Sequence, residues 1–132
     1  MVLVDTSAWI ELVRNTGSRT HRRLRWLARE PRALATSEVV VMELLGGARS
    51  ETEFARLRQT LVGCRLLPLY GLEDFEDAAS LYRTCRRAGT TIRSFIDCLI
   101  AVVAMRHNAE VLHIDRDFTL IARHVPLRIA EV

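Results

Sequence analysis

Five acidic residues stand beside or inside apolar segments of this 132-residue chain: Asp5, Glu43, Asp97, Asp115 and Asp117. Burying an ionised carboxylate costs free energy unless a cation or hydrogen-bond donors compensate for it. Carboxylates that converge on one point also repel each other, and Mg²⁺ is bound through oxygen ligands. The five acids therefore indicate a divalent-metal site that activates water for phosphodiester hydrolysis.

The basic residues are compatible with a phosphate-containing substrate. All 19 of them are Arg, and the formal net charge is only +3. Arg presents a planar, bidentate donor that suits phosphate. The absence of Lys excludes mechanisms that need a Schiff-base or P-loop lysine.

Predicted strands and helices alternate along the chain. Short apolar runs predict strands at residues 1–5, 33–35, 64–69, 111–114 and 126–129. Helical patterns lie between them, at residues 8–13, 21–29, 37–45, 51–61, 72–88, 94–107 and 119–124. Pro68 restricts the third strand to an edge or an end. The alternation predicts an α/β fold, a central parallel sheet flanked by helices, most simply as one domain over residues 1–132.

The predicted fold brings several of the acids to one edge of the sheet. Ligands of open α/β sheets bind beyond the carboxyl ends of the strands. Asp5 ends the first predicted strand, while Asp115 and Asp117 follow a later one. Asp97 falls in the first turn of the most apolar helix, and Glu43 interrupts another apolar helix that has no basic residue within a turn.

Each acid also has a simpler explanation when it is taken alone. Asp5 could cap the first helix, and Asp97 stands three residues after Ser94, as in a capping box. Glu43 could be solvated on its helix, and Asp is common in the loops that follow strands. It is the joint occurrence of the acids that favours a functional site.

Cysteine usage and hydropathy indicate a cytoplasmic protein. Cys64, Cys85 and Cys98 are odd in number and lack CxxC spacing, so they are interpreted as reduced core thiols. The first residues do not form a signal peptide, and the longest apolar run, near residues 98–105, is too short to span a bilayer. We expect no membrane association.

Four motifs occur in order along the chain: VDTSAWI at 4–10, SEVVVMELLGG at 37–47, RSFIDCLIA at 93–101 and HIDRDF at 113–118. Together they resemble the PIN-domain ribonucleases and, within that family, the VapC-type toxins of toxin–antitoxin pairs. The resemblance covers nearly the whole chain. It implies a PIN-like three-layer α/β/α sandwich and a Mg²⁺-dependent endoribonuclease, with Mn²⁺ as a substitute ion, acting on tRNA, mRNA or rRNA. It also implies inhibition by a VapB-type antitoxin and a homodimer.

The resemblance assigns roles to individual residues. It implies that Asp5, Glu43, Asp97 and Asp115 form the acidic quartet of the family, and that Asp117 is an additional acid. Asp5 and Asp97 are expected to be the most direct metal ligands, with Asp115 or Asp117 as a third, while Glu43 binds a second ion or orients water. The candidate contacts to ligand, phosphate or antitoxin are Thr6, Ser7, Arg93 and Arg116.

Two other functions stay open at this stage. The sequence from Asp115 to Thr119 fits the DxDxT pattern of haloacid-dehalogenase-type phosphatases, although that motif should end the first strand of its fold, and here only 13 residues follow it. Alternatively, the chain only binds RNA or a protein partner. Substitution of Asp5 separates these cases, because a binding module would not need the acid.

Overall fold

A computed structural model describes all of residues 1–132 and contains one sheet of five parallel strands. The order across the sheet is β3-β2-β1-β4-β5, so the first strand is central and β3 is an edge strand, as Pro68 predicted. The strands are β1 (Val2–Val4), β2 (Leu34–Thr36), β3 (Arg65–Leu66), β4 (Glu110–Leu112) and β5 (Arg128–Ile129).

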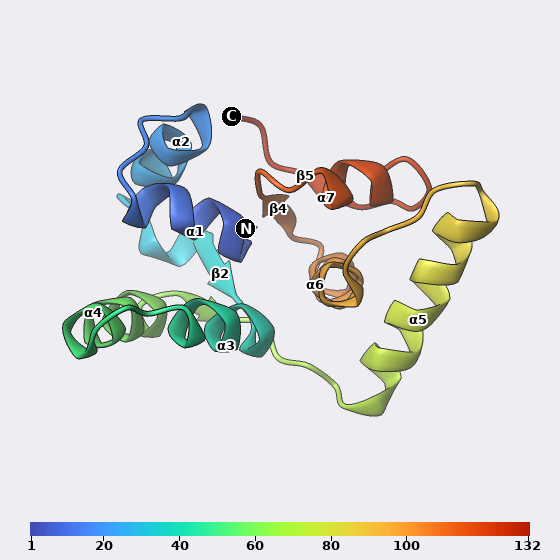
Figure 1. The fold of residues 1–132 in the computed structure, drawn as a ribbon, viewed down its shortest axis with the longest axis horizontal. Helices are drawn as coiled ribbons and strands as arrows, with labels where there is room; N and C mark the ends of the chain where they lie inside the picture. Colours follow the sequence, from blue (N-terminus) through green and yellow to red (C-terminus); the bar gives the residue numbers. More distant parts are fainter.

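Seven helices cover the two faces of the sheet and complete the predicted three-layer α/β fold (Figure 1). The first four gather at the left of the view and the last three at the right. Right-handed crossovers explain this division, because the chain first winds from β1 towards β3 and then returns past β1 to β4 and β5. The helices are α1 (Thr6–Val13), α2 (Arg19–Leu27), α3 (Glu38–Gly46), α4 (Glu51–Val62), α5 (Leu72–Arg87), α6 (Phe95–Arg106) and α7 (Arg116–Ile121).

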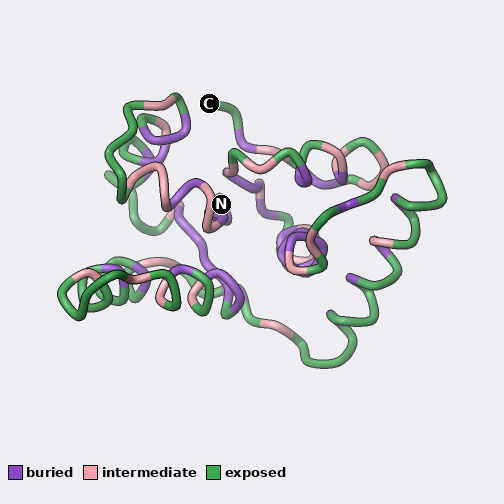
Figure 2. Tube along the Cα trace, in the orientation of Figure 1, coloured by how far each residue is buried: buried purple, intermediate pink, exposed green.

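The core is built around β1 and α6. All three residues of β1 are buried, and eight consecutive residues of α6, from Asp97 to Ala104, are buried as well (Figure 2). Trp9 and Phe118 are the largest fully buried side chains. Cys85 and Cys98 are buried free thiols, and burial is the main reason that the pKa of Cys98 rises to about 12. The longest helix, α5, has 16 residues, and no helix has the length and apolarity needed to cross a membrane.

Hydroxyl and carboxylate caps set where the helices begin, and they correct three predicted boundaries. Ser37 caps α3 and Ser94 caps α6. The first helix begins at Thr6 rather than Ala8, because Asp5 is its cap. The second helix begins at Arg19 rather than His21, because Ser18 is its cap. The last helix begins at Arg116 rather than Thr119, because the Asp115 carboxylate accepts a hydrogen bond from the backbone N–H of Asp117 at 3.0 Å.

A buried ion pair fixes α5 against the far end of α6. The Asp74 side chain is fully buried, and the Arg106 guanidinium lies directly against it. The same carboxylate accepts the backbone N–H of Tyr70 at 2.6 Å, and the Tyr70 ring lies 4.2 Å from the Arg106 guanidinium carbon. Burial raises the pKa of Asp74, but the hydrogen bonds from Arg106 and Tyr70 outweigh it, so the pKa falls below its usual value.

Candidate metal centre

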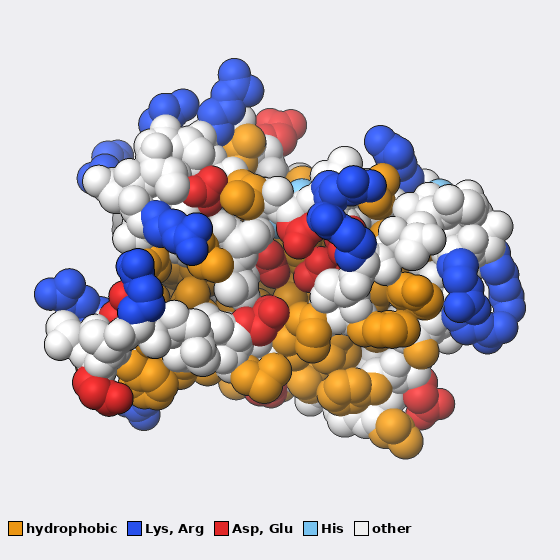
Figure 3. Space-filling model, viewed as in Figure 1, with side chains coloured by type: hydrophobic (Ala, Val, Ile, Leu, Met, Phe, Trp, Pro, Cys, Tyr) orange, Lys and Arg blue, Asp and Glu red, His pale blue; other side chains and the backbone are white.

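The acids converge where the connections that leave β1 and β4 diverge. The chain leaves β1 towards β2 on one side, and it leaves β4 towards β5 on the other. Such a switch point opens a crevice at the carboxyl edge of a parallel sheet. The backbone N–H of Asp5 donates to the carbonyl of Leu112 at 3.0 Å, so the two strand ends are adjacent. Figure 3 shows acidic side chains gathered in a hollow near the middle of this face.

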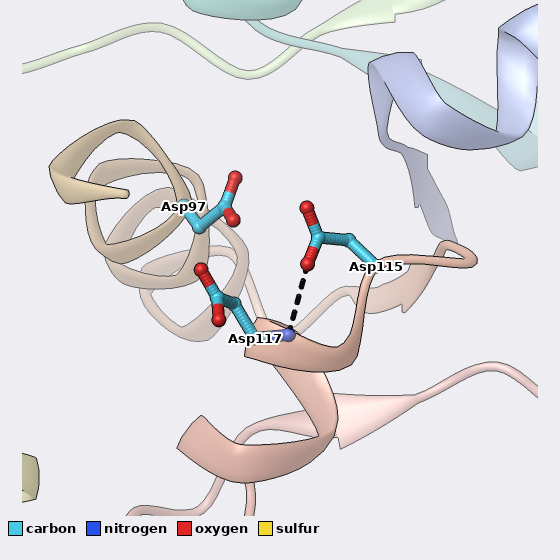
Figure 4. Close-up of side chains that lie close together, drawn as sticks. All are labelled: Asp97, Asp115 and Asp117. Atoms are coloured by element: carbon cyan, nitrogen blue, oxygen red, sulfur yellow. Dashed lines mark hydrogen bonds between the residues drawn. The ribbon is translucent and has the colours of Figure 1, made fainter. Parts of the chain in front are cut away.

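Three aspartates form the closest group. One carboxylate oxygen from each of Asp97, Asp115 and Asp117 lies within 4.8 Å of the other two. Figure 4 shows Asp97 projecting from the first turn of α6 towards the two others, which stand at the start of α7. The Asp117 carboxylate also accepts a hydrogen bond, at 3.1 Å, from the backbone N–H of Arg93 in the connection between α5 and α6. The carboxylates of Asp115 and Asp117 are thus held by backbone N–H groups before any ligand binds, whereas the Asp97 carboxylate accepts none.

The electrostatics of this group call for a cation. The pKa of Asp97 is raised to about 8, first by burial and then by the charges of Asp115, Asp5 and Asp117, in that order of importance. Oδ2 of Asp97 and Oδ1 of Asp117 are buried without a hydrogen-bond partner. An ionised carboxylate in that position is unstable unless a positive charge is added. An all-carboxylate donor set of this kind fits a hard divalent ion.

Asp5 is buried beside this group and is held by Ser7. Its Oδ2 accepts the Ser7 hydroxyl at 2.6 Å and the Ser7 backbone N–H at 3.0 Å. The Ser7 oxygen in turn accepts the backbone N–H of Ile114 at 3.1 Å, which links the ends of β1 and β4. Burial raises the pKa of Asp5, although the Ser7 hydrogen bonds lower it in part. Asp5 is outside the group of three, so its role as a direct ligand stays a prediction.

Glu43 stands at the exposed rim of the site. It lies on α3, and its Oε1 accepts the Thr6 hydroxyl at 3.0 Å. Partial burial raises its pKa, the Thr6 hydrogen bond lowers it, and the charge of Asp5 raises it. Thr6 and Ser7 therefore position acids in this structure, while their predicted contact with a ligand or phosphate stays open.

The two predicted arginines differ in position. The guanidinium of Arg93 lies 3.9 Å from Asp115 Oδ1 and 3.8 Å from Asp117 Oδ1, and about two thirds of its side chain is exposed. An exposed ion pair of this length is weak, so Arg93 is free to reorient towards a bound anion. Arg116 is exposed at the first position of α7 and forms no ion pair.

Sequence patterns did not single out three further residues around the site. His113 packs against Phe118 with the ring centres 5.1 Å apart, and burial lowers its pKa. The one sequence signal that could have indicated His113 is its position just before Ile114 and Asp115. Arg14 and Arg49 line a hollow of about 210 Å³ that Glu43 and Thr6 also line. No sequence pattern joins them, because the hollow forms only when α1 packs against α3 and α4.

The chain belongs to the PIN-domain family, whose model matches residues 2–124. Known relatives include a ribonuclease VapC11 of Mycobacterium tuberculosis and a VapC ribonuclease of Mycobacterium bovis. Each is 44% identical over 131 residues, and the alignment covers 98% of both chains. The family assignment made from the four motifs is confirmed.

Solved structures confirm the fold. VapBC2 of Rickettsia felis, bound to a DNA fragment, matches with a TM-score of 0.74 at 19% identity and 98% coverage of both chains. VapC20 of Mycobacterium tuberculosis, described as a sarcin-ricin-loop-cleaving toxin, matches with a TM-score of 0.69 at 21% identity, covering 97% of this chain and 99% of that one. At these identities the likeness concerns the fold alone.

Proposed function

We propose that this chain is a VapC-type toxin, a metal-dependent endoribonuclease that hydrolyses phosphodiester bonds in RNA and is inhibited by a VapB-type antitoxin. One observation carries the catalytic part: Asp97, Asp115 and Asp117 converge within 4.8 Å, and Asp97 is buried there with a strongly raised pKa. The 44% identity to VapC ribonucleases over nearly the full length supports the same activity.

The residues present fit Mg²⁺, with Mn²⁺ as a substitute. Asp97 with Asp115 or Asp117 would hold the ion, and Asp5 would complete the set. When bound, the ion lowers the pKa of a water molecule and stabilises the leaving oxygen. Both raised pKa values, those of Asp97 and Asp5, are lowered again when positive charge is supplied.

The remaining groups orient the reactants. Ser7 holds Asp5 in place through its hydroxyl. Glu43, at the exposed rim and held by Thr6, would accept a hydrogen bond from the attacking water. Arg93 contacts the acids only at 3.8 Å and 3.9 Å and is exposed, so it can turn to a phosphate oxygen of the RNA strand.

The direct test is incubation of the purified protein, freed of any partner, with total cellular RNA in Mg²⁺ or in EDTA. Cleavage should require Mg²⁺, and mapping the cut ends identifies the target RNA. Asp97→Asn should lower the cleavage rate by at least about 100-fold, the usual scale for losing one group that stabilises developing charge.

The matched control is Asp77→Asn, which removes the same charge from an exposed position on α5. It should cleave like the unsubstituted protein. Equal cleavage by Asp97→Asn and Asp77→Asn, or cleavage that persists in EDTA, would refute the metal-nuclease assignment and favour a binding module.

The proposal includes two protein partners, an antitoxin and a second copy of this chain. Solved VapBC complexes share this fold, which supports a VapB-type partner. We also propose a homodimer, because large apolar side chains are exposed on α3, around the start of α5 and at the start of α6, and Figure 3 shows apolar atoms gathered on this part of the surface. These side chains are Met42, Tyr70, Leu72, Phe75 and Phe95. Sedimentation of Phe75→Glu as a monomer, against a dimer for the unsubstituted chain, tests this assembly.

The cellular setting completes the proposal. Residues 1–132 would act as a single PIN domain in the cytoplasm, where its RNA targets are found and where the free thiols of Cys64, Cys85 and Cys98 stay reduced. Fractionation of cells that express the tagged chain tests the location.

A further inference from the structure

Positive charge is concentrated in one short segment of the chain. Residues 12–29 contain six Arg and no acid. The rest of the chain has 13 Arg against 16 acidic residues, a net charge of −3, so this segment makes the protein basic. Half of the segment is α2, which packs on α1, the helix that begins next to Asp5 at the acidic centre.

The charge on the outward face of α2 has little compensation within the molecule, where Arg22 donates a hydrogen bond to the Gly17 carbonyl at 2.9 Å. Leu24 and Leu27 are buried, while Arg19, Arg22 and Arg25 are exposed. Like charges three or four residues apart destabilise a helix, and no arginine of α2 forms an ion pair with an acid. A face that accumulates repulsion with little internal compensation is complementary to a polyanion.

An exposed tryptophan stands among these arginines. Trp26 is 56% exposed, and the Arg23 guanidinium carbon lies 4.7 Å from the centre of its ring. Arg22, Arg25, Trp26 and Arg29 together line a shallow hollow. Aromatic rings next to basic side chains bind single-stranded nucleic acid, because bases stack on the ring while the arginines contact phosphates.

We propose that the exposed face of α2 is a binding surface for single-stranded RNA, with one unpaired base stacked on Trp26 and flanking phosphates on Arg25 and Arg29. Arg22 and Arg25 lie on α2, and Arg29 stands two residues beyond its last residue, Leu27. The surface deepens the proposed function, since it would hold part of the RNA substrate outside the acidic centre.

The position of α2 suits this role. It lies beside α1 in Figure 1, and Figure 3 shows basic side chains projecting from this corner on the same face as the acids. Phosphate contacts of this kind position a strand without reading its sequence. The α2 surface is thus expected to raise affinity for RNA while leaving the chemistry to the acids.

The chain contains its own reporter for the test. Of its two tryptophans, Trp9 is 1% exposed and Trp26 is 56% exposed, so quenching by a bound base reports on Trp26. The binding experiment uses the full chain carrying Asp97→Asn, in EDTA, with a short fluorescein-labelled single-stranded RNA of mixed sequence. Neither condition permits cleavage, so binding is measured separately from the proposed activity.

Two sets of variants define the expected result. Trp26→Ala should weaken binding about tenfold, and Trp26→Phe should retain most of it. Arg25→Gln with Arg29→Gln should lower the slope of log affinity against log salt by about 1.4, since each single-strand phosphate contact contributes about 0.7. The matched control, Arg83→Gln with Arg87→Gln on α5, removes the same charge from the opposite layer and should change the slope little.

Three outcomes would overturn the proposal. They are equal loss of affinity in the α5 control, no quenching of Trp26 by RNA, and unchanged RNA binding by the α2 variants. The last result, combined with loss of a co-purifying antitoxin, would identify α2 as a protein interface instead. If the unsubstituted chain cleaves RNA but its α2 variants bind normally, only this inference fails. If RNA binds through α2 but is never cleaved, only the proposed activity fails.

Discussion

The two ends of α6 each hold a buried aspartate, and the two environments are opposite. Asp97, in the first turn of α6, faces three other carboxylates and has a pKa raised to about 8, chiefly by burial. Asp74 meets Arg106 in the last turn of α6, and that partner together with the Tyr70 N–H keeps its pKa below the usual value despite burial. The helix dipole favours both arrangements, so it does not explain the difference. The difference arises because the Arg106 cation lies against Asp74, whereas no cation lies against Asp97.

The comparison shows how a structural acid differs from a functional one in this fold. Burial alone does not mark the site, because Asp74 is the more completely buried of the two. What marks the site is burial without an internal cation. The two arrangements lie at opposite ends of α6: Asp97 without a cation at its start, and Asp74 of α5 paired with Arg106 at its end. Substitutions at the two ends can therefore be compared in one protein.

The largest expected effect on stability is at the end of α6 where Arg106 pairs with Asp74. Asp74→Ala leaves the largely buried Arg106 with only the exposed Asp77 as an ion-pair partner and should lower the free energy of unfolding by about 3 kcal/mol. Urea denaturation measures this change. Asp77→Ala on the same helix, whose carboxylate is exposed and 3.7 Å from Arg106, should cost less than about 0.5 kcal/mol. Similar losses in both variants would mean that the buried pair is not special.

At the Asp97 end of α6, removing the carboxylate should stabilise the metal-free protein rather than destabilise it. In EDTA, Asp97→Asn should raise the free energy of unfolding by about 3 kcal/mol more at pH 8 than at pH 5, because a neutral amide replaces a carboxyl group that ionises among like charges as the pH rises. Destabilisation of the metal-free protein at pH 8 would contradict the assigned electrostatics.

Added metal should act on only one of the two ends. Mg²⁺ at ten times its dissociation constant should stabilise the unsubstituted protein by about 1.4 kcal/mol through linkage. Asp74→Ala should keep this increment, although it starts from a lower stability, while Asp97→Asn should lose it. The measurement is thermal or urea denaturation in a Mg²⁺ series, and a shift of equal size in all three proteins would reflect a general salt effect.

The most gradual effect is a change of the free energy of unfolding with pH. The folded pKa of Asp97 lies above its unfolded value of 3.8, so its contribution to stability is full below about pH 4 and is lost as the pH rises towards 8. The folded pKa of Asp74 lies below that value, so its contribution is present above about pH 4 and is lost on acidification.

Metal-free protein should therefore lose about 1 kcal/mol per pH unit between roughly pH 5 and 8. Asp97→Asn should remove most of this decrease between about pH 5 and 8. Asp74→Ala should instead reduce the loss of stability on acidification below about pH 4. A profile that is flat from pH 5 to 8 in the unsubstituted chain would argue against the raised pKa of Asp97.

Much of the fold and the identity of the acids could be predicted from local signals. Alternating apolar segments predicted a parallel sheet, and Pro68 placed β3 at its edge. Ser94 and Asp97 were recognised at capping-box spacing, and the structure shows that Ser94 caps α6.

Three helix starts were misplaced by two or three residues. Asp5 was considered as a cap, but the helix was still expected from Ala8. Ser18 and Asp115 were interpreted as loop residues, while each caps the helix that follows it.

Asp74 shows why the rest needed the structure. Four acids occur between Glu73 and Asp77, a pattern typical of a solvated helix face. Nothing local distinguishes Asp74 from its neighbours, because its partner Arg106 is 32 residues away in the chain. Likewise, the links from Ser7 to Ile114 and from Thr6 to Glu43 join positions 107 and 37 residues apart. Contacts of that range depend on how helices pack on the sheet.

The sequence by itself determined which carboxylates and arginines the protein has, their order in the PIN motifs, and the strand–helix alternation that sends them to one edge. Only the tertiary structure decided which of them meet. It grouped Asp97 with Asp115 and Asp117, left Glu43 at the rim, gave Asp74 its own cation and exposed the arginines of α2 beside Trp26. The physical reason is that residue type and spacing set what each side chain can do, whereas burial and neighbouring charges, which set its pKa and partners, arise only on packing.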